Sequence, residues 1–348
     1  MAVVVRPVDL VGERQTLIDF LGKHLTAVDH CKRFDWLYRD NPVGTAWAWF
    51  IVEQQTKEIV GAASLFPRAV WVGKDVKRCG QVGDFAIDAK YRSLGPALLL
   101  QRATFQPVQQ GHLEFCYDCP PHALGMSTFK RIGLNVSCPM VSYVRLIRAD
   151  RQVIRFLGDG VIGRAASSIA NAMLALRISR RREEKGVEIA VHAGLFGDEF
   201  SDLDRRTRHD VPIRGRRAAK DLNWRYQMDP LTEYQVLTAR RRGEIEAYLV
   251  FIRRADDAYV IDLFTGTSTE IAVGLLHAAA ERARAQTAQT LRMFVGAHAP
   301  ARACLNRAGL VYRTDAMNVV AYAESTNPIH PLLCDPRNWD FNYGDIIA

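Results

Sequence analysis

The chain has 348 residues, of which 48% are apolar and 24% are charged. These values are typical of a soluble globular protein, and they exclude a fibrous, disordered or disulfide-scaffold class. The 46 basic and 38 acidic residues give a net charge of +8, which many enzymes of anionic cofactors share, so we expect no nucleic-acid partner.

Periodicity predicts strands at residues 3–8, 47–54, 59–72, 80–88, 112–118 and 135–147, and helices at 11–25, 96–109 and 123–132. This order predicts a mixed α/β (α+β) fold. Apolar residues then recur at helical spacing from Val153 to Leu176, which predicts a helical connector. We expect it to break near residues 158–163 and to pack the second half of the chain on the first.

After Gly186, motifs of the first half return in the same order. FDWLYRDNP at 34–42 recurs as LNWRYQMDP at 222–230, so that Trp36 matches Trp224 and Tyr38 matches Tyr226. Three further matches follow: KEIVGA at 57–62 with GEIEAY at 243–248, QVGDF at 81–85 with YVIDL at 259–263, and FKRIGL at 129–134 with LNRAGL at 305–310. The series predicts duplication of one fold. The predicted divisions are a first domain at 1–148, the connector at 149–185, a second domain at 186–325 and a tail at 326–348.

The segment from Gly83 to Ala103 has the most informative pattern. A strand ends at Ile87 or Asp88, a short loop follows, and an apolar helix begins near Gly95. The loop and helix start combine a cation, a glycine and a proline in the order Arg92, Ser93, Leu94, Gly95, Pro96, Ala97. A helix start offers unpaired N–H groups and a positive dipole end, so this pattern predicts a phosphate site. An ordinary strand–loop–helix connection uses Gly and Pro in the same way.

Residues 82–103 resemble motif A of the GNAT superfamily of acyl-CoA N-acyltransferases. The family's pattern is filled by Ile87, Arg92, Gly95 and Ala97, with Ala89 at the usual proline. Motif B is similar to His122, Gly125, Phe129, Arg131, Gly133 and Leu134. The resemblance covers most of residues 1–147 and extends weakly to about 325 through the repeat. The whole arrangement looks like the tandem GNAT proteins often associated with bacterial exopolysaccharide synthesis.

The resemblance implies acetyl-CoA or another acyl-CoA as cosubstrate and no metal. The loop from Arg92 to Ala97 would hold the pyrophosphate, and backbone N–H groups of a splayed strand would face the thioester oxygen. Those N–H groups belong to Phe85, Ala86 and Ile87.

Asp84 is the predicted base for the amine's proton, directly or through a water. A structural strand-end aspartate explains it equally well, because Asp262 stands at the matching place in the second half. The family's tyrosine acid falls on Phe129, which cannot donate a proton and is left as a predicted cofactor contact. Tyr117 is a substitute acid, and the thiolate is also able to leave unassisted.

The second half lacks an Arg-x-x-Gly before its helix. Thr269 falls near the place of Arg92, and Glu270 would repel pyrophosphate. We therefore expect one acyl-CoA per chain, a second domain that shapes the acceptor groove, and a 1–148 fragment that retains some CoA binding.

Four other features bear on site and compartment. Cys116 and Cys119 with His122 lack a second Cys pair, so no metal or redox site is expected. The basic block at 205–220 is expected to be a solvated loop, with contact to an anionic acceptor or a membrane surface as the alternative. The aromatic tail at 334–345 is expected to be an ordered strap. Seven cysteines and the lack of a signal peptide or a spanning stretch predict a cytoplasmic protein.

The expected function is N-acyl transfer, of acetyl above all, to an amino group of a sugar or polysaccharide precursor. One alternative is a FemAB-like aminoacyl or peptide transferase, which would not need the phosphate loop at Arg92 and Gly95. Another is a non-catalytic binding protein built on decayed GNAT domains, which Phe129 supports.

Overall fold

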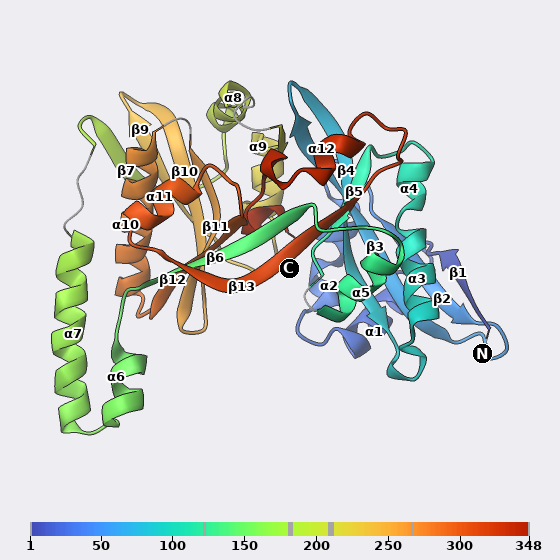
Figure 1. Cartoon of the computed structure of the whole chain (residues 1–348), viewed down its shortest axis with the longest axis horizontal. Helices are drawn as coiled ribbons and strands as arrows, with labels where there is room; N and C mark the ends of the chain where they lie inside the picture. Colours follow the sequence, from blue (N-terminus) through green and yellow to red (C-terminus); the bar gives the residue numbers. More distant parts are fainter. Residues whose placement is uncertain (1, 121–122, 180–183, 208–211, 266–267, 347–348) are drawn as a thin grey trace.

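The computed structural model describes residues 2–120, 123–179, 184–207, 212–265 and 268–346. It has the predicted mixed α/β fold, with its strands joined in one large sheet (Figure 1). The strands of the first half are β1 (Val3–Pro7), β2 (Trp47–Glu53), β3 (Ile59–Val72), β4 (Asp75–Ile87), β5 (Phe115–Asp118) and β6 (Cys138–Leu146). Its helices and turns are α1 (Arg14–His24), α2 (His30–Phe34), the π-helical turn η1 (Asp35–Arg39), η2 (Ala89–Tyr91), α3 (Leu94–Ala103), α4 (Gln106–Gln109) and α5 (Ala123–Arg131).

The helix predicted at 96–109 is two helices, because Pro107 lies in the first turn of α4. Proline suits a helix start, where its missing N–H is not needed, and interrupts a continuous helix. The helical turns α2 and η1 were not predicted, since their short block shows no apolar period over a long window.

The second half follows the connector helices α6 (Asp150–Leu157) and α7 (Val161–Ser179). Its strands are β7 (Val187–His192), β8 (Ile213–Gly215), β9 (Gln235–Arg241), β10 (Glu244–Arg254), β11 (Asp257–Thr265), β12 (Thr290–Gly296), β13 (Val311–Tyr322) and β14 (Trp339–Asp340). Its helices and turns are α8 (Asp198–Arg206), α9 (Ala219–Leu222), the π-helical turn η3 (Asn223–Gln227), α10 (Thr269–Ala285), α11 (Arg302–Arg307), α12 (His330–Cys334), η4 (Pro336–Asn338) and η5 (Tyr343–Asp345).

The two halves exchange strands at the centre of the sheet. The order is β1-β2-β3-β4-β5-β13-β6-β12-β11-β10-β9-β7. Strand β13 of the second half pairs with β5 and β6, and β6 of the first half pairs with β12 and β13. In each half two strands run parallel, β4 with β5 and β11 with β12, next to the exchanged strand. The sheet of the first half therefore depends on a strand that lies beyond residue 300.

The repeated Trp-x-Tyr blocks meet between the halves. Trp36 Nε1 donates to the Trp224 carbonyl oxygen at 2.7 Å, and Trp224 Nε1 donates to the Trp36 carbonyl oxygen at 2.9 Å. The two rings stack with their centroids 5.2 Å apart. The glycines of the last matched block also share one backbone conformation, with φ of 80° at Gly133 and 78° at Gly309. These two matched pairs thus occupy similar places in their halves.

The connector is a helical hairpin that breaks at Gly158, where φ is 76°, as predicted. Helix α7 packs on α6 and on α10, and Arg284 of α10 donates to the carbonyl oxygen of Asn171 at 2.7 Å. The far end of the hairpin projects from the molecule (Figure 1). The expectation that this helix packs the two halves together is therefore wrong, because the halves meet through β6, β13 and the Trp pair. Among the described helices, none is long and apolar enough to cross a membrane.

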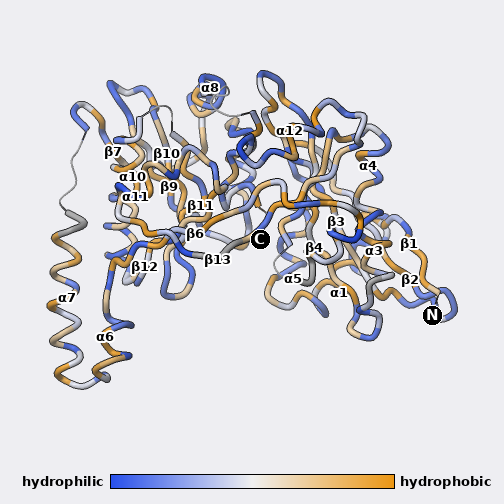
Figure 2. Tube along the Cα trace, in the orientation of Figure 1, coloured by the Kyte–Doolittle hydropathy of each residue, from blue (hydrophilic) through white to orange (hydrophobic). Residues whose placement is uncertain are grey.

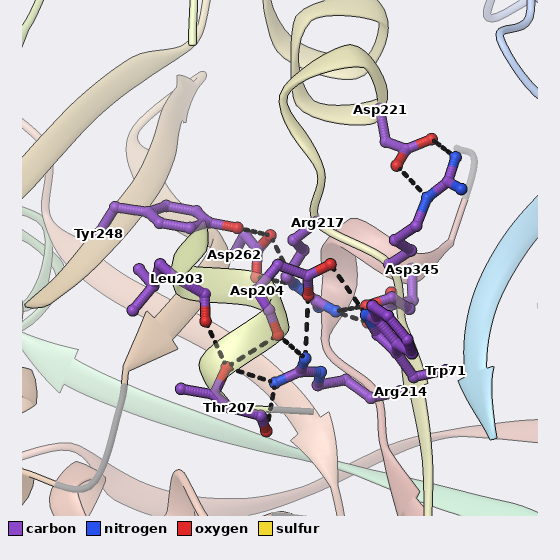
Figure 3. A network of polar contacts seen from close by, with 12 residues as sticks. Trp71, Leu203, Asp204, Thr207, Arg214, Arg217, Asp221, Tyr248, Asp262 and Asp345 are labelled. Carbon is purple, nitrogen blue, oxygen red and sulfur yellow. Dashed lines mark hydrogen bonds and ion pairs between the residues drawn. The ribbon is translucent and has the colours of Figure 1, made fainter. Parts of the chain in front are cut away.

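The basic block at 205–220 is not a solvated loop where the structure describes it. Arg214 and Arg217 are buried, and Arg214 Nη2 donates to Asp204 Oδ1 at 2.9 Å (Figure 3). Trp71 of the first half donates to the same carboxylate at 2.8 Å. Residues 208–211 of the block lie outside the described residues. The tail is an ordered strap, as predicted, because β14 pairs with β8 and Trp339 is fully buried.

Candidate functional site

Strand β4 carries a bulge at Asp84. The β3–β4 register shifts between Ala62 and Ser64, and Asp84 has a φ of 47°, a left-handed conformation that is uncommon for a residue with a side chain. The parallel pairing of β4 with β5 covers only Cys79 to Gln81. No described strand pairs with the β5-facing edge of β4 beyond Gln81, which includes Phe85, Ala86 and Ile87. The structure therefore has a splayed strand where the sequence predicts one.

The Asp84 carboxylate is held by two residues that the sequence did not single out as site residues. The guanidinium of Arg33, on α2, forms an ion pair with Asp84 Oδ1, and the Tyr38 hydroxyl donates to Oδ2 at 2.7 Å. Tyr38 also shares a hydrogen bond of 2.8 Å with Ser64. Burial raises the pKa of Tyr38 well above its ordinary value, and the Asp84 charge raises it further, so the hydroxyl stays protonated and donates. The sequence matches of Tyr38 with Tyr226 and of Asp84 with Asp262 could have indicated that Tyr38 and Asp84 lie together.

The loop after β4 leads to the start of α3. Arg92 is exposed, and its Nε donates to the Ile87 carbonyl oxygen at 3.0 Å, which folds the side chain back along the loop. Ser93 is the N-cap residue but makes no side-chain cap hydrogen bond. Gly95 is exposed, and a Cβ added there would meet nothing within 4 Å, while Pro96 and Ala97 are half-buried. The Ala97 N–H donates to the Ser93 carbonyl oxygen at 3.4 Å, and no side-chain cap satisfies the N–H groups of Leu94 and Gly95.

Two predicted site residues lie in core clusters instead. Phe129 on α5 is buried with Leu100 and Ala103 of α3. Tyr117 on β5 is buried in the cluster around Trp339, and its hydroxyl donates to the Asp345 carbonyl oxygen at 2.7 Å. Burial raises the pKa of Tyr117 well above its ordinary value. This placement favours structural roles for both side chains. His122, the first residue of the motif B resemblance, lies outside the described residues.

Asp262 is the counterpart of Asp84 in the second half, and it is fully enclosed. Arg217 Nε donates to Asp262 Oδ2 at 3.1 Å, and Tyr226 and Tyr248 each donate to the same oxygen at 3.2 Å (Figure 3). Asn342 of the tail donates to Oδ1 at 2.6 Å. The Asp262 side chain is 2% exposed, whereas the Asp84 side chain is 6% exposed. The two carboxylates share a Tyr–Asp–Arg arrangement, and the tail closes only the second.

The start of α10 differs from the start of α3 in both capping and charge. Ser268 caps the helix by accepting from the Ile271 N–H and donates its own hydroxyl to Glu184 at 3.0 Å. A cavity of about 320 Å³ at this end is lined by Glu184, Glu188 and Glu270 and, among the described residues, by no basic residue. Glu184 and Glu270 pair with Arg241 and Arg307. Among the described residues no cluster of three or more potential metal ligands occurs.

A scan against protein-family models finds no match, and a search of curated proteins finds no significant relative. Solved structures give clear similarities of fold. A probable N-acyltransferase from Enterococcus faecalis is 10% identical with a TM-score of 0.66 over 93% of this chain and 73% of that chain. A GCN5-related N-acetyltransferase from Anabaena variabilis is 11% identical with a TM-score of 0.63 over 91% of this chain and 72% of the other. N-myristoyltransferase from Saccharomyces cerevisiae with bound myristoyl-CoA is 10% identical, with a TM-score of 0.58 over 92% of this chain and 82% of the other. The chain therefore has the fold of GCN5-related N-acyltransferases.

Proposed function

We propose that the chain is an N-acyltransferase that binds acyl-CoA in its first half and transfers the acyl group to an amine. The observation that carries the proposal is the succession of a bulged, splayed β4 and the uncapped start of α3. The splayed edge offers backbone N–H groups to a thioester oxygen, and the helix start offers N–H groups and a positive dipole to pyrophosphate. The acidic start of α10 supports a single donor site per chain.

In the proposed reaction the amine nitrogen attacks the thioester carbonyl carbon, so that a C–N bond forms as the C–S bond breaks. Backbone N–H groups at Phe85 to Ile87 stabilise the oxyanion. Asp84, whose carboxylate accepts from Arg33 and Tyr38, receives the amine's proton directly or through a water. The Tyr117 hydroxyl is committed to the Asp345 carbonyl oxygen, so we propose that the thiolate leaves with its electron pair and without a protein acid.

The proposed acceptor is the amino group of a sugar or polysaccharide precursor, and the second half shapes the groove that receives it. The resemblance to exopolysaccharide-associated tandem proteins supports this acceptor class. A CoA thioester as donor and seven cysteines that are all free thiols support a cytoplasmic place of action.

Isothermal titration with acetyl-CoA tests the donor site. We expect one acetyl-CoA per chain, and weaker binding by about 1–3 kcal/mol in Arg92→Ala, because a charge-assisted phosphate contact is lost. Gly95→Val should block the approach of pyrophosphate without a clash inside the protein, since the position faces open space. Arg102→Ala is the matched control, because Arg102 lies in the last turn of the same helix.

If titration of the parent protein with acetyl-CoA gives no heat of binding, the alternative of a non-catalytic protein on decayed GNAT domains is favoured. Acyl transfer from an aminoacyl-tRNA without acetyl-CoA binding would favour the FemAB-like alternative. Two acetyl-CoA molecules per chain, or full affinity in Arg92→Ala and Gly95→Val, would contradict the assignment of the donor site.

A further inference from the structure

A cavity of about 740 Å³ lies in the second half, between the α6–α7 hairpin, the ends of β6, β12 and β13, and helices α10 and α11. None of its lining residues is Asp or Glu, and the lining contains a group of arginines: Arg145, Arg151, Arg292, Arg307 and Arg313. Its size is that of a small-molecule site. The residues that line it come from seven different elements and the chain between them.

The carboxylates nearby do not balance these arginines. Asp257 is shared by Arg151 at 3.5 Å and Arg292 at 3.3 Å. Arg307 pairs with Glu270 at 2.6 Å, and Arg313 donates to the Tyr312 carbonyl oxygen at 3.1 Å. Among the described side chains, three of the five guanidinium groups thus contact two carboxylates.

Arg145 is the deepest of the group, with 8% of its surface exposed. Its Nη1 lies 3.3 Å from His277 Nδ1, and no carboxylate among the described side chains forms an ion pair with it, although Glu281 attracts it from farther away. A guanidinium kept out of water without a paired anion is costly, so a bound anion would stabilise this arrangement. Structural proteins rarely keep such a group unless a ligand or partner meets it.

The corresponding cavity of the first half is a natural comparison. It has about 810 Å³, uses the matching ends of α3, α5 and β13, and contains two arginines, Arg102 and Arg131, both exposed. The repeat matches Arg131 in sequence with Arg307. The residues that line the first-half cavity include no buried cation that corresponds to Arg145. The concentration of positive charge is therefore particular to the second half.

We infer that the Arg145 cavity is a second ligand site, separate from the acyl-donor site, for a molecule that carries at least two phosphate charges on an apolar body. Planar guanidinium groups bind phosphate oxygens in pairs, and Arg145, Arg292 and Arg313 surround one space. Val144, Leu146 and Leu174 supply apolar contact beside them.

Calorimetric titration with inorganic pyrophosphate tests this site. We expect binding to the parent, at least about tenfold weaker binding in Arg145→Met, and a smaller loss in Arg313→Gln, since charge-assisted hydrogen bonds are removed. Arg313 is exposed, so its variant keeps the test valid if Arg145→Met fails to fold. Arg102→Met, in the corresponding cavity, should bind pyrophosphate like the parent, whereas Arg92→Ala reports any binding of pyrophosphate at the proposed donor site.

The inference is overturned if the parent does not bind pyrophosphate, or if both cavity variants bind it normally. It is also overturned if Arg92→Ala alone abolishes binding, because pyrophosphate would then report the donor site. If Arg145→Met instead abolishes acetyl-CoA binding while Arg92→Ala does not, the cavity is the donor site and no second site exists.

The tip of the α6–α7 hairpin carries an independent observation. Phe156, Val161 and Ile162 are 82%, 86% and 77% exposed, and Leu157 is exposed beside them. Apolar positions continue along the outer face of α7 at Ile169, Met173 and Leu176. Figure 2 shows hydrophobic residues along α6 and α7, in the part of the molecule that projects from the sheet. Solvent-exposed clusters of this kind mark interaction sites.

The charges of the hairpin complement an anionic surface. Residues 148–176 contain four arginines and two aspartates, a net charge of +2, and Asp159 at the tip is paired with Arg164 at 3.3 Å. Arg155, one residue before Phe156, is exposed, and its side chain forms no hydrogen bond or ion pair with the described residues. We propose that the hairpin docks on an anionic lipid bilayer, with the tip residues in the interface and the arginines at the headgroups.

Sedimentation with vesicles of phosphatidylcholine, with and without phosphatidylglycerol, tests this docking. The parent should bind the anionic vesicles, and Phe156→Ser/Val161→Ser should reduce the bound fraction at least severalfold without loss of melting temperature, since both side chains face water. Val11→Ser/Leu195→Ser is the matched control, because these residues are equally exposed elsewhere. The proposal is overturned if the parent does not bind the vesicles or if the tip variant binds them equally well. It is also overturned if the parent is a dimer that only the tip variant disperses, because the tip would then bind a second copy of the chain.

Discussion

Asp84 and Asp262 show how one carboxylate position serves two surroundings. Both accept from a tyrosine of the repeated block and pair with an arginine. Asp262 is also closed over by Asn342 of the tail, whereas Asp84 lies at a bulge next to the unpaired edge of β4. The tyrosine and arginine contacts are common to both carboxylates, so a chemical role of Asp84 must depend on its place beside the unpaired edge of β4.

The comparison of Asp84→Asn with Asp262→Asn separates the two roles. Asp84→Asn leaves the buried Arg33 without its carboxylate, so it should lose about 3–5 kcal/mol of stability. Asp262→Asn should lose less, because Arg217 keeps its ion pair with Asp345 at 3.0 Å. At working temperature, acetyl-CoA affinity should survive in both. Turnover should fall about a hundredfold to ten-thousandfold in Asp84→Asn only, because general-base loss has that cost.

Denaturant unfolding gives the stability change, and single-turnover kinetics with an identified acceptor gives the rate. Equal turnover in the two variants would leave Asp84 with the structural role of fixing the bulge.

At this scale the sequence predicted the position of Asp84 and the loop from Arg92 to Gly95, because both depend on neighbours in the chain. It did not predict that Arg33 reaches Asp84, or that Tyr117 bonds to Asp345. Those contacts join residues far apart in the sequence, and no local pattern encodes them.

The Trp36–Trp224 pair is the contact between elements that most directly joins the halves. Each indole N–H satisfies a backbone carbonyl of the other block, so the two turns η1 and η3 position one another. The sequence matched these tryptophans at a constant offset but could not place them in contact. Strand bounds of the first half were predicted better, since alternating apolar residues specify them locally, although β4 begins at Asp75 and not at residue 80. For the second half the sequence predicted matched motifs and no strand bounds.

Phenylalanine substitutions measure this contact. Trp36→Phe and Trp224→Phe should each cost about 1–3 kcal/mol, because a buried carbonyl loses its donor. The double variant should cost less than the sum of the two, by about 0.5–3 kcal/mol, since the rings and carbonyls form one contact.

Chemical denaturation of the four proteins gives the coupling energy. Trp36→Phe combined with Trp49→Phe is the control, because Trp49 belongs to a different core cluster and donates to Gln106. A coupling near zero in the first pair would mean that the stacked rings do not stabilise the contact between the halves.

For the whole molecule, the exchange of β6 and β13 makes the halves interdependent. The sequence predicted a boundary at 148 because the repeat ends there, and both exchanged segments read as ordinary alternating strands. Alternation fixes which face of a strand is apolar, and it does not specify the neighbouring strand. The pairing of β6 and β13 needs residues from both halves, so neither half can form it alone.

The exchange changes the expectation for a fragment of residues 1–148. In that fragment β6 has no partner, since it pairs only with β12 and β13, and β5 loses β13 from one side. An unpaired strand exposes its backbone N–H and C=O groups and promotes aggregation. We therefore expect the fragment alone to aggregate or to unfold without a cooperative transition, and to lose acetyl-CoA binding.

Coexpressed fragments 1–148 and 149–348 should copurify as one complex, because both strands then find their partners. Size-exclusion chromatography and thermal melting monitored by circular dichroism check this result, and a monomeric 1–148 fragment with a sharp transition and the parent's acetyl-CoA affinity would show that the first half does not need β13.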